Sequence, residues 1–387
     1  MENFVFQNAT RIVFGRGTEE AVGRETASMA KRVLLHYGGK SIKASGLLDR
    51  VRARLKEAGV GFEELGGVVP NPRLSLVKEG IRLVRQHKLA GILAVGGGSV
   101  IDSAKAIGIG VPYAGDVWDF YTRKAEVKEM LPVGVVLTIP AAGSEASNAS
   151  VVTTEEGLSK KDAGAECMRP RFAVMDPLLT TTLPAYQTAC GAADIMAHVM
   201  ERYFTRVKAV DLTDRFCEAV LRTIIRNVPI ALAKSDDYDA RAEIMWAGTV
   251  AHNDLLSTGR IGDWATHMIE HEVSGIYDVA HGAGLAVLFP AWMTHVMRHD
   301  VDRFARFATR VFDAEHDYAT SERTAREGVR RLRTFWKGIG LPGTLSEMGV
   351  GADRLDEMAR KATERGPLGS FVKLGQADVL AILELAR

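Results

Sequence analysis

The 387-residue sequence has few cysteines, almost no net charge and no long hydrophobic run. Its 3 cysteines form no CxxC pair and are odd in number, which is typical of reduced thiols in a cytoplasmic protein. The 49 Lys plus Arg against 48 Asp plus Glu give no charge excess that favours nucleic acid or an anionic membrane. We find neither a run of about 18 apolar residues nor a signal peptide. We therefore expect a cytoplasmic protein with no nucleic-acid or membrane partner.

The two halves of the chain have different hydrophobic patterns. In the first half, β-like runs at residues 33–37, 91–95 and 133–139 alternate with helical stretches, for example at 41–58 and 74–87. This alternation predicts a parallel sheet with crossover helices. From Pro184 onward the periodicity is almost entirely helical. We predict an α/β domain over residues 1–183 and an all-helical domain over residues 184–387.

A glycine-rich turn joins the predicted strand at 91–95 to the next helix. Residues 96–99 read Gly-Gly-Gly-Ser, and Asp102 and Lys105 follow on the first turns of that helix. Small residues at this position let backbone N–H groups approach a phosphate at a helix N-terminus. The alternative is that the glycines serve only the turn.

A second glycine pair closes the strand at 33–37. Gly38 and Gly39 are followed by Lys40, Ser41 and Lys43, and no carboxylate stands where one would hold a ribose 2′-hydroxyl. Two lysines at this place suit a 2′-phosphate and favour NADP over NAD. The alternative is that both lysines are only solvated.

Five candidate metal ligands lie in the second half of the chain. Asp194 and His198 are four residues apart, as are His267 and His271, and His281 follows between small residues. Residues at this spacing share one helix face, and a carboxylate with several imidazoles suits a divalent transition metal. We predict a turn with an unusual backbone path at Gly282 and Gly284. Spacing alone does not identify the surplus residue, and each histidine could instead be a hydrogen-bonded core or surface residue.

Several motifs together resemble one enzyme family over nearly the whole chain. They are FVFQNATRIVFGRGT, YGGKSIK, PNPRLS, GGGSVIDSAK, TIPAAGSE, GDWATHMIEHEVSG and YDVAHGAGLAVLFPAWM. The chain resembles the iron-dependent (group III) alcohol dehydrogenases, and within them the NADP(H)-dependent butanol dehydrogenase and aldehyde reductase branch. This resemblance implies a Rossmann-like domain followed by a helical metal-binding domain, the dehydroquinate synthase-like fold, and a homodimer.

The resemblance also implies roles for individual residues. It makes Asp194, His198, His267 and His281 the ligands of one divalent metal, Fe²⁺ first and Zn²⁺ or Ni²⁺ as alternatives. It places His271 near the nicotinamide for proton relay, so His267 and His271 are the implied catalytic residues. The implied NADP(H)-binding residues are Gly38, Gly39, Ser41, Asn71, Gly97, Gly98, Ser99, Asp102, Thr138, Ser144 and Lys160.

The implied reaction is hydride transfer between NADP(H) and a primary alcohol or aldehyde. The alternatives on the same fold are a dehydroquinate synthase-like lyase and a glycerol dehydrogenase-like enzyme. The lyase would need a site rich in Lys and Arg, whereas apolar residues such as Trp264, Met268, Ile269, Val273 and Tyr277 lie around the histidines. A fourth ligand argues against the glycerol enzymes, which typically use one Asp and two His. A nucleotide-binding protein without activity would be expected to have lost ligands, and this chain has all four.

Overall fold

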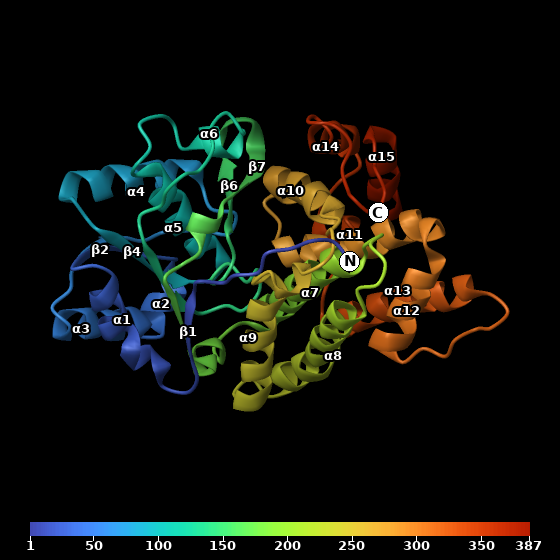
Figure 1. Ribbon diagram of the computed structural model, residues 1–387, viewed down its shortest axis with the longest axis horizontal. Coiled ribbons are helices and arrows are strands. Elements are labelled where there is room, and N and C mark those ends of the chain that lie inside the picture. The colour runs from blue at the N-terminus through green and yellow to red at the C-terminus, as the bar shows by residue number, and fades with distance from the viewer. The chain divides into compact units, whose positions relative to one another are not determined.

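The computed structural model describes residues 1–387 and divides into two units (Figure 1). The α/β unit comprises residues 7–183 and 235–249, and the helical unit comprises residues 1–6, 184–234 and 250–387. The predicted fold class is confirmed, because one unit contains a parallel sheet and the other contains helices without a sheet. None of the helices combines the length and hydropathy needed to cross a bilayer.

Six parallel strands form the sheet of the α/β unit, in the order β1-β8-β5-β4-β2-β3. All six residues of β4 and all five of β5 are buried, as expected for central strands that are covered on both faces. The strands are β1 (Arg11–Phe14), β2 (Arg32–Tyr37), β3 (Gly61–Leu65), β4 (Gly91–Gly96), β5 (Val133–Leu137) and β8 (Phe172–Met175).

Helices cover both faces of this sheet (Figure 1). Apolar side chains of α4 and α5 pack on one face against strand residues such as Ile92 and Val135. Side chains of α1 and α3 pack on the other face against residues such as Val33 and Val95. The helices of this unit are α1 (Val22–Met29), α2 (Lys40–Ala44), α3 (Leu47–Glu57), α4 (Leu74–His87), α5 (Gly98–Gly110) and α6 (Trp118–Tyr121).

The register of the central strands aligns their carboxyl ends. Tyr37 at the end of β2 pairs with Val95, and Gly96 at the end of β4 pairs with Leu137 at the end of β5. The segments that follow β2, β4 and β5 therefore start from one edge of the sheet. In open α/β sheets this edge is where ligands bind.

An antiparallel hairpin, β6 (Ala149–Thr154) with β7 (Ser159–Gly164), was not among the sequence predictions. Its strands carry polar and charged residues, so they lack the apolar runs that identified the parallel strands. Val151 donates its backbone N–H to Asp102 of α5, and Thr153 donates to the carbonyl of Pro72. These contacts fix the hairpin beside α5 and the start of α4.

Helices build the second unit around α7, whose apolar residues are almost all buried. Helices α8 and α11 pack against α7, and α10 packs against α11. Trp292 of α11 contacts the rings of Phe204 and Phe289 in the buried core. The helices of this part of the chain are α7 (Ala185–Tyr203), α8 (Asp211–Ala233), α10 (Ala265–Tyr277), α11 (His281–Val296), α12 (Val301–Phe312), α13 (Ser321–Gly338), α14 (Leu355–Ala362) and α15 (Gln376–Leu385).

Two short segments depart from the predicted division into two continuous domains. Residues 1–6 belong to the helical unit, where the Met1 amine donates to the Lys208 carbonyl and Glu2 donates to the Gly259 carbonyl. Residues 235–249, which include most of α9 (Tyr238–His252), belong to the α/β unit. There Thr249 donates its hydroxyl to buried Glu145, and Met245 joins the apolar core.

The turn predicted at Gly282 and Gly284 was wrong, because both glycines lie inside α11. A Cβ atom at Gly282 would lie 2.0 Å from the carbonyl oxygen of Cys190 in α7. At Gly284 it would lie 2.7 Å from Oε1 of Glu270 in α10. The glycines therefore permit close packing of α11 on its neighbours, and they do not provide an unusual backbone path.

Candidate metal centre and cofactor site

Three helices of the helical unit carry the five candidate ligands. Asp194 and His198 lie on α7, His267 and His271 lie on α10, and His281 is the first residue of α11. The first four are buried, and the side chain of His281 is 23% exposed. The spacing of four residues places each pair on one helix face, as predicted.

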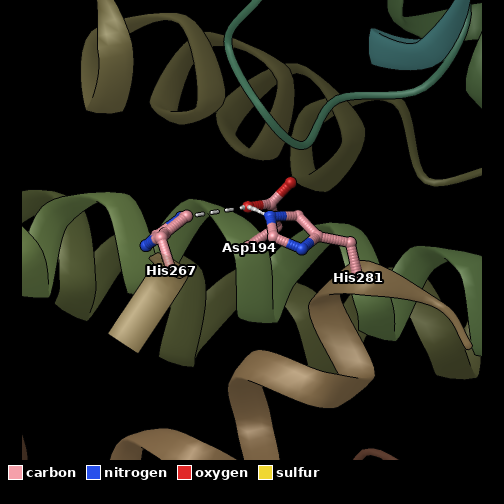
Figure 2. A group of neighbouring side chains, drawn as sticks. All are labelled: Asp194, His267 and His281. Carbon is pink, nitrogen blue, oxygen red and sulfur yellow. Dashed lines mark ion pairs between the residues drawn. The ribbon is translucent and has the colours of Figure 1, made fainter. Parts of the chain in front are cut away.

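Asp194, His267 and His281 bring their ligand atoms together (Figure 2). Oδ1 of Asp194 lies 4.0 Å from Nε2 of His267 and 3.9 Å from Nε2 of His281. One ligand atom from each of the three residues lies within 4.8 Å of the others. Two ligands bound at about 2.1 Å to one ion lie at most about 4 Å apart, so a small adjustment accommodates a metal.

The Nδ1 atoms of all three candidate histidine ligands lie against oxygen atoms, and that of His198 is 3.0 Å from Oδ1 of Asp194 itself. Nδ1 of His267 donates to Oε1 of Glu201 across 2.8 Å, and Nδ1 of His281 donates to Glu270. Nδ1 of His198 lies 2.9 Å from the carbonyl oxygen of Asp194. A proton on Nδ1 leaves the lone pair of Nε2 available. Nε2 of His267 is buried and has no hydrogen-bond partner, so these residues fit a divalent cation.

His198 lies beside the group without joining it. Its ring centroid is 4.5 Å from that of His267, but the close set of ligand atoms does not include this residue. On its other side His198 packs edge-on against His252 at 4.3 Å. Because its Nδ1 is engaged by Asp194, Nε2 is the atom through which His198 would act as a fourth ligand.

His271 lies next to the metal candidates on the side of His281. The centroids of the two rings are 5.6 Å apart, and His271, His281 and Glu270 form a second close group of potential ligand atoms. The family resemblance gives His271 no role as a metal ligand, and the structure places it beside His281, which the resemblance does make a ligand.

Burial favours the neutral form of His267. It lowers the pKa of His267 well below its usual value, and the charges of neighbouring histidines lower it further. A neutral imidazole is the form that binds a metal. Burial raises the pKa of Glu201, as does the charge of Asp263, whereas the N–H groups of His267 and Trp264 oppose that rise.

Sequence reasoning missed Glu201 and Glu270, and it assigned no role to His252. The available signal was a carboxylate in an otherwise apolar helical stretch, three residues after His198 in one case and three after His267 in the other. Residues three apart on a helix are neighbours, so these carboxylates lie near the ligand rings. Of the apolar residues around the histidines, Ile269 and Val273 are fully buried.

The predicted phosphate-binding turn lies at the start of α5 in the α/β unit. Gly97 precedes the helix, and a Cβ atom there would lie 2.9 Å from Ile139, so the backbone approaches the next segment closely. The N–H groups of Gly98 and Ser99 are in the first helical turn and have no partner within the helix. This end of α5 can receive an anion.

Two residues of α5, partly buried Asp102 and fully buried Lys105, hold the segment that carries Ser144. Asp102 accepts hydrogen bonds from the Ser144 hydroxyl at 2.5 Å and from the Val151 N–H at 3.0 Å. Lys105 donates to the Ser144 hydroxyl at 3.2 Å and to the carbonyls of Ser147 and Ala149, both at 2.9 Å. Burial lowers the pKa of Lys105 to about 8 and raises that of Asp102. Asp102 thus stabilises the segment around Ser144, which follows β5.

The remaining predicted cofactor residues lie around the same edge of the sheet. Gly38 and Gly39 follow β2, Ser41 lies in α2, and Thr138 follows β5 and donates to the Gly96 carbonyl. Lys160 of β7 is paired with Thr153 of β6 in the hairpin. Thr153 also forms an isolated β-bridge with Arg73, two residues after Asn71. Gly38, Gly39, Ser41 and Thr138 therefore lie in the segments that follow the carboxyl ends of β2 and β5.

The chain matches one protein family along almost its whole length. Residues 9–177 match the family described as "Iron-containing alcohol dehydrogenase". Residues 188–387 match the "Fe-containing alcohol dehydrogenase family, C-terminal".

Similar proteins and structures carry related names. The chain is 41% identical over 387 residues to NADH-dependent butanol dehydrogenase A of Clostridium acetobutylicum, covering 99% of each chain. It is 35% identical over 369 residues to the NADPH-dependent aldehyde reductase YqhD of Escherichia coli, covering 95% of this chain and 94% of that one. The crystal structure of NADH-dependent butanol dehydrogenase A from Thermotoga maritima superposes with a TM-score of 0.96 at 38% identity, covering 100% and 99%.

These comparisons decide between the alternatives that the sequence left open. With His198 outside the close group, the number of ligands no longer separates this chain from the glycerol enzymes. The family matches favour neither that alternative nor the lyase. The chain belongs to the iron-containing alcohol dehydrogenase family and is an enzyme of that family.

Proposed function

We propose that the protein transfers a hydride between NADP(H) and a primary alcohol or aldehyde of the butanol and butanal type, with one divalent metal ion per chain. The observation that carries this proposal is the convergence of Asp194, His267 and His281, with the Nδ1 atoms of both histidines held by carboxylates. Asp194, His198, His267 and His281 would hold the ion, Fe²⁺ in the first place and Zn²⁺ or Ni²⁺ as alternatives. When bound, such an ion supplies Lewis-acid polarisation of the substrate oxygen.

The protein's own groups handle the proton. In the oxidation direction the carbinol carbon loses a hydride to the nicotinamide, and the hydroxyl loses a proton. We assign uptake of that proton to His271, directly or through a water molecule, because it is buried beside His281 and an imidazole can both accept and donate a proton. In the reduction direction the same ring returns the proton.

The finer choice of NADP(H) rests on the end of β2. No carboxylate follows Tyr37, and Lys40 and Lys43 stand in the first residues after the strand. The ammonium group of Lys43 lies 5.8 Å from the centre of the Tyr37 ring, at the same sheet edge as the start of α5. The names of the relatives divide between NADH and NADPH, so the preference needs a direct measurement.

We also propose a cytoplasmic homodimer. The three cysteines are free thiols, as expected in a reducing compartment. Strand β1 pairs only with β8, so its other edge can accept a strand from a second copy. A molar mass of one chain by light scattering would contradict the dimer.

The decisive experiment follows the oxidation of NADPH and NADH by butanal in matched assays. The protein is measured as purified, after chelation, and after addition of single metal ions. The proposal predicts activity that disappears on chelation, returns with one metal, and has a higher kcat/KM with NADPH. Failure of every metal to support turnover with butanal would contradict the proposed reaction.

A further inference from the structure

Two histidines of the candidate metal centre each contact a buried glutamate through Nδ1, the ring nitrogen that does not face the centre. Glu201 of α7 accepts from Nδ1 of His267, and Glu270 of α10 accepts from Nδ1 of His281. The side chains of both glutamates are fully buried. Burying a carboxylate is costly unless it is paired and hydrogen-bonded, so two such groups behind two potential ligands need an explanation.

The contacts of Glu201 show what its carboxylate does. Oε1 accepts from Nδ1 of His267 at 2.8 Å and from its backbone N–H at 3.0 Å, and Oε2 accepts from the Trp264 N–H at 2.6 Å. Both oxygens are therefore acceptors. An ionised Glu201 has no proton to donate, so Nδ1 donates to Oε1. The proton of the neutral ring then lies on Nδ1, and the lone pair of Nε2 is left for a metal.

Glu201 also fixes the start of the helix that carries His267. Trp264 is the N-cap residue of α10, in the left-handed region at φ 66°, and offers no side-chain cap. The N–H of His267, at the third helical position, is one of the donors that an N-cap side chain would normally satisfy. Here the cap comes from another helix, so one carboxylate positions both the backbone and the ring of His267.

Glu270 has a corresponding arrangement around His281. Its Oε2 accepts from His281 and also from the Ser274 hydroxyl at 3.2 Å. The carboxylate of Glu270 fits beside Gly284 only because that residue has no side chain. A Cβ atom at Gly284 would lie 2.7 Å from Oε1 of Glu270. The sequence thus provides both the carboxylate and the room for it.

We propose that Glu201 and Glu270 are positioning residues that fix the Nδ1-protonated tautomer and the orientation of His267 and His281 and so set the affinity of the metal site. The inference rests on the metal site of the proposed function. Carboxylates behind metal-bound histidines typically change metal affinity by about 10- to 100-fold when they are altered.

The test compares Glu201→Gln and Glu270→Gln with Glu218→Gln. A glutamine at position 201 has one acceptor oxygen in place of two. Its NH₂ group therefore faces either the Trp264 N–H or the two donors of His267. Glu218 is the matched control, because it is a buried carboxylate of the same unit that contacts Tyr203 and Arg306 away from the centre. The measurements on the full-length proteins are the Kd for Co²⁺ by chelator competition and the visible absorption of bound Co²⁺, which reports its ligand geometry.

We expect Kd to rise about 10- to 100-fold in both site variants, with an altered Co²⁺ spectrum, and to stay within about twofold in Glu218→Gln. Unchanged Kd and spectrum in the site variants, or an equal loss in Glu218→Gln, would overturn the inference. If one site variant does not fold, the other decides. Wild-type protein that binds no Co²⁺ would overturn the proposed metal site itself, which separates the two failures.

Discussion

Nδ1 of His267 donates to Oε1 of Glu201 across 2.8 Å, although 66 residues separate the two in the sequence. This contact joins α10 to α7, and α7 also carries Asp194 and His198. The candidate metal centre is therefore assembled by packing between helices, in addition to the spacing within each helix. Changes to the ligands and changes to the helix packing have separable consequences.

Replacement of His267 by alanine is predicted to remove the metal and the activity while leaving the α/β unit able to bind nucleotide. The ring supplies a buried Nε2 that lies 4.0 Å from the Asp194 carboxylate, and alanine supplies no ligand. Loss of the several kcal/mol of Lewis-acid stabilisation lowers turnover by about a thousandfold or more. Metal content by mass spectrometry and NADPH binding by fluorescence check this. A variant that is both metal-loaded and active would refute the ligand assignment.

Gly39→Asp is predicted to weaken the use of NADPH selectively. Nothing lies within 4 Å of a Cβ atom at Gly39, so there is space for a side chain. A carboxylate there would face a 2′-phosphate, and like charges in contact should raise the KM for NADPH at least about tenfold. The KM for NADH should change little. Equal changes with the two cofactors would count against a 2′-phosphate subsite at this position.

Gly282→Ala is predicted to destabilise the helical unit. The added methyl group would lie 2.0 Å from the Cys190 carbonyl, so α11 must move from α7 at a cost of about 1–3 kcal/mol or more. Gly338→Ala is the control, because Gly338 lies in α13 with nothing within 4 Å of an added Cβ atom. That substitution should stabilise by about 0.4–1 kcal/mol. Urea unfolding of both variants measures the difference, and equal midpoints would contradict it.

The stability of the α/β unit is predicted to fall on acidification because of His36. This fully buried ring on β2 contacts the Leu65 carbonyl and the Ser103 hydroxyl, each at 2.8 Å, and burial lowers its pKa to about 4. Between pH 6.5 and about 4 the unfolded chain binds the extra proton, so stability decreases as pH falls through that window. The difference between the pKa of His36 in the unfolded chain and in the folded protein corresponds to a loss of about 3 kcal/mol in the free energy of unfolding.

His36→Gln provides the matched control for this pH dependence, because glutamine keeps one donor and one acceptor and does not titrate. Urea unfolding at pH 7 and pH 4 should show a smaller loss of stability in the variant than in the wild type. Parallel losses in the two proteins would show that His36 does not cause the effect.

Local periodicity was enough to predict the parallel sheet and the helices that carry Asp194, His198, His267 and His271, because each signal lies within one element. The apolar runs of β4 and β5 indicated central strands, and the spacing of His267 and His271 indicated a shared helix face. Contacts between distant segments left no such signal. Gly282 and Gly284 suggested a turn because glycine opens backbone conformations, whereas packing against Cys190 and Glu270 decides their role.

The most direct test of the metal centre is a crystal structure of the metal-loaded protein with anomalous data collected at the absorption edge of iron. The account predicts one anomalous peak about 2.0–2.2 Å from an oxygen of Asp194 and from Nε2 of His267 and of His281, with Nε2 of His198 turned toward it. A peak held instead by Glu270, His271 and His281, or no peak at Asp194, would contradict the central claim.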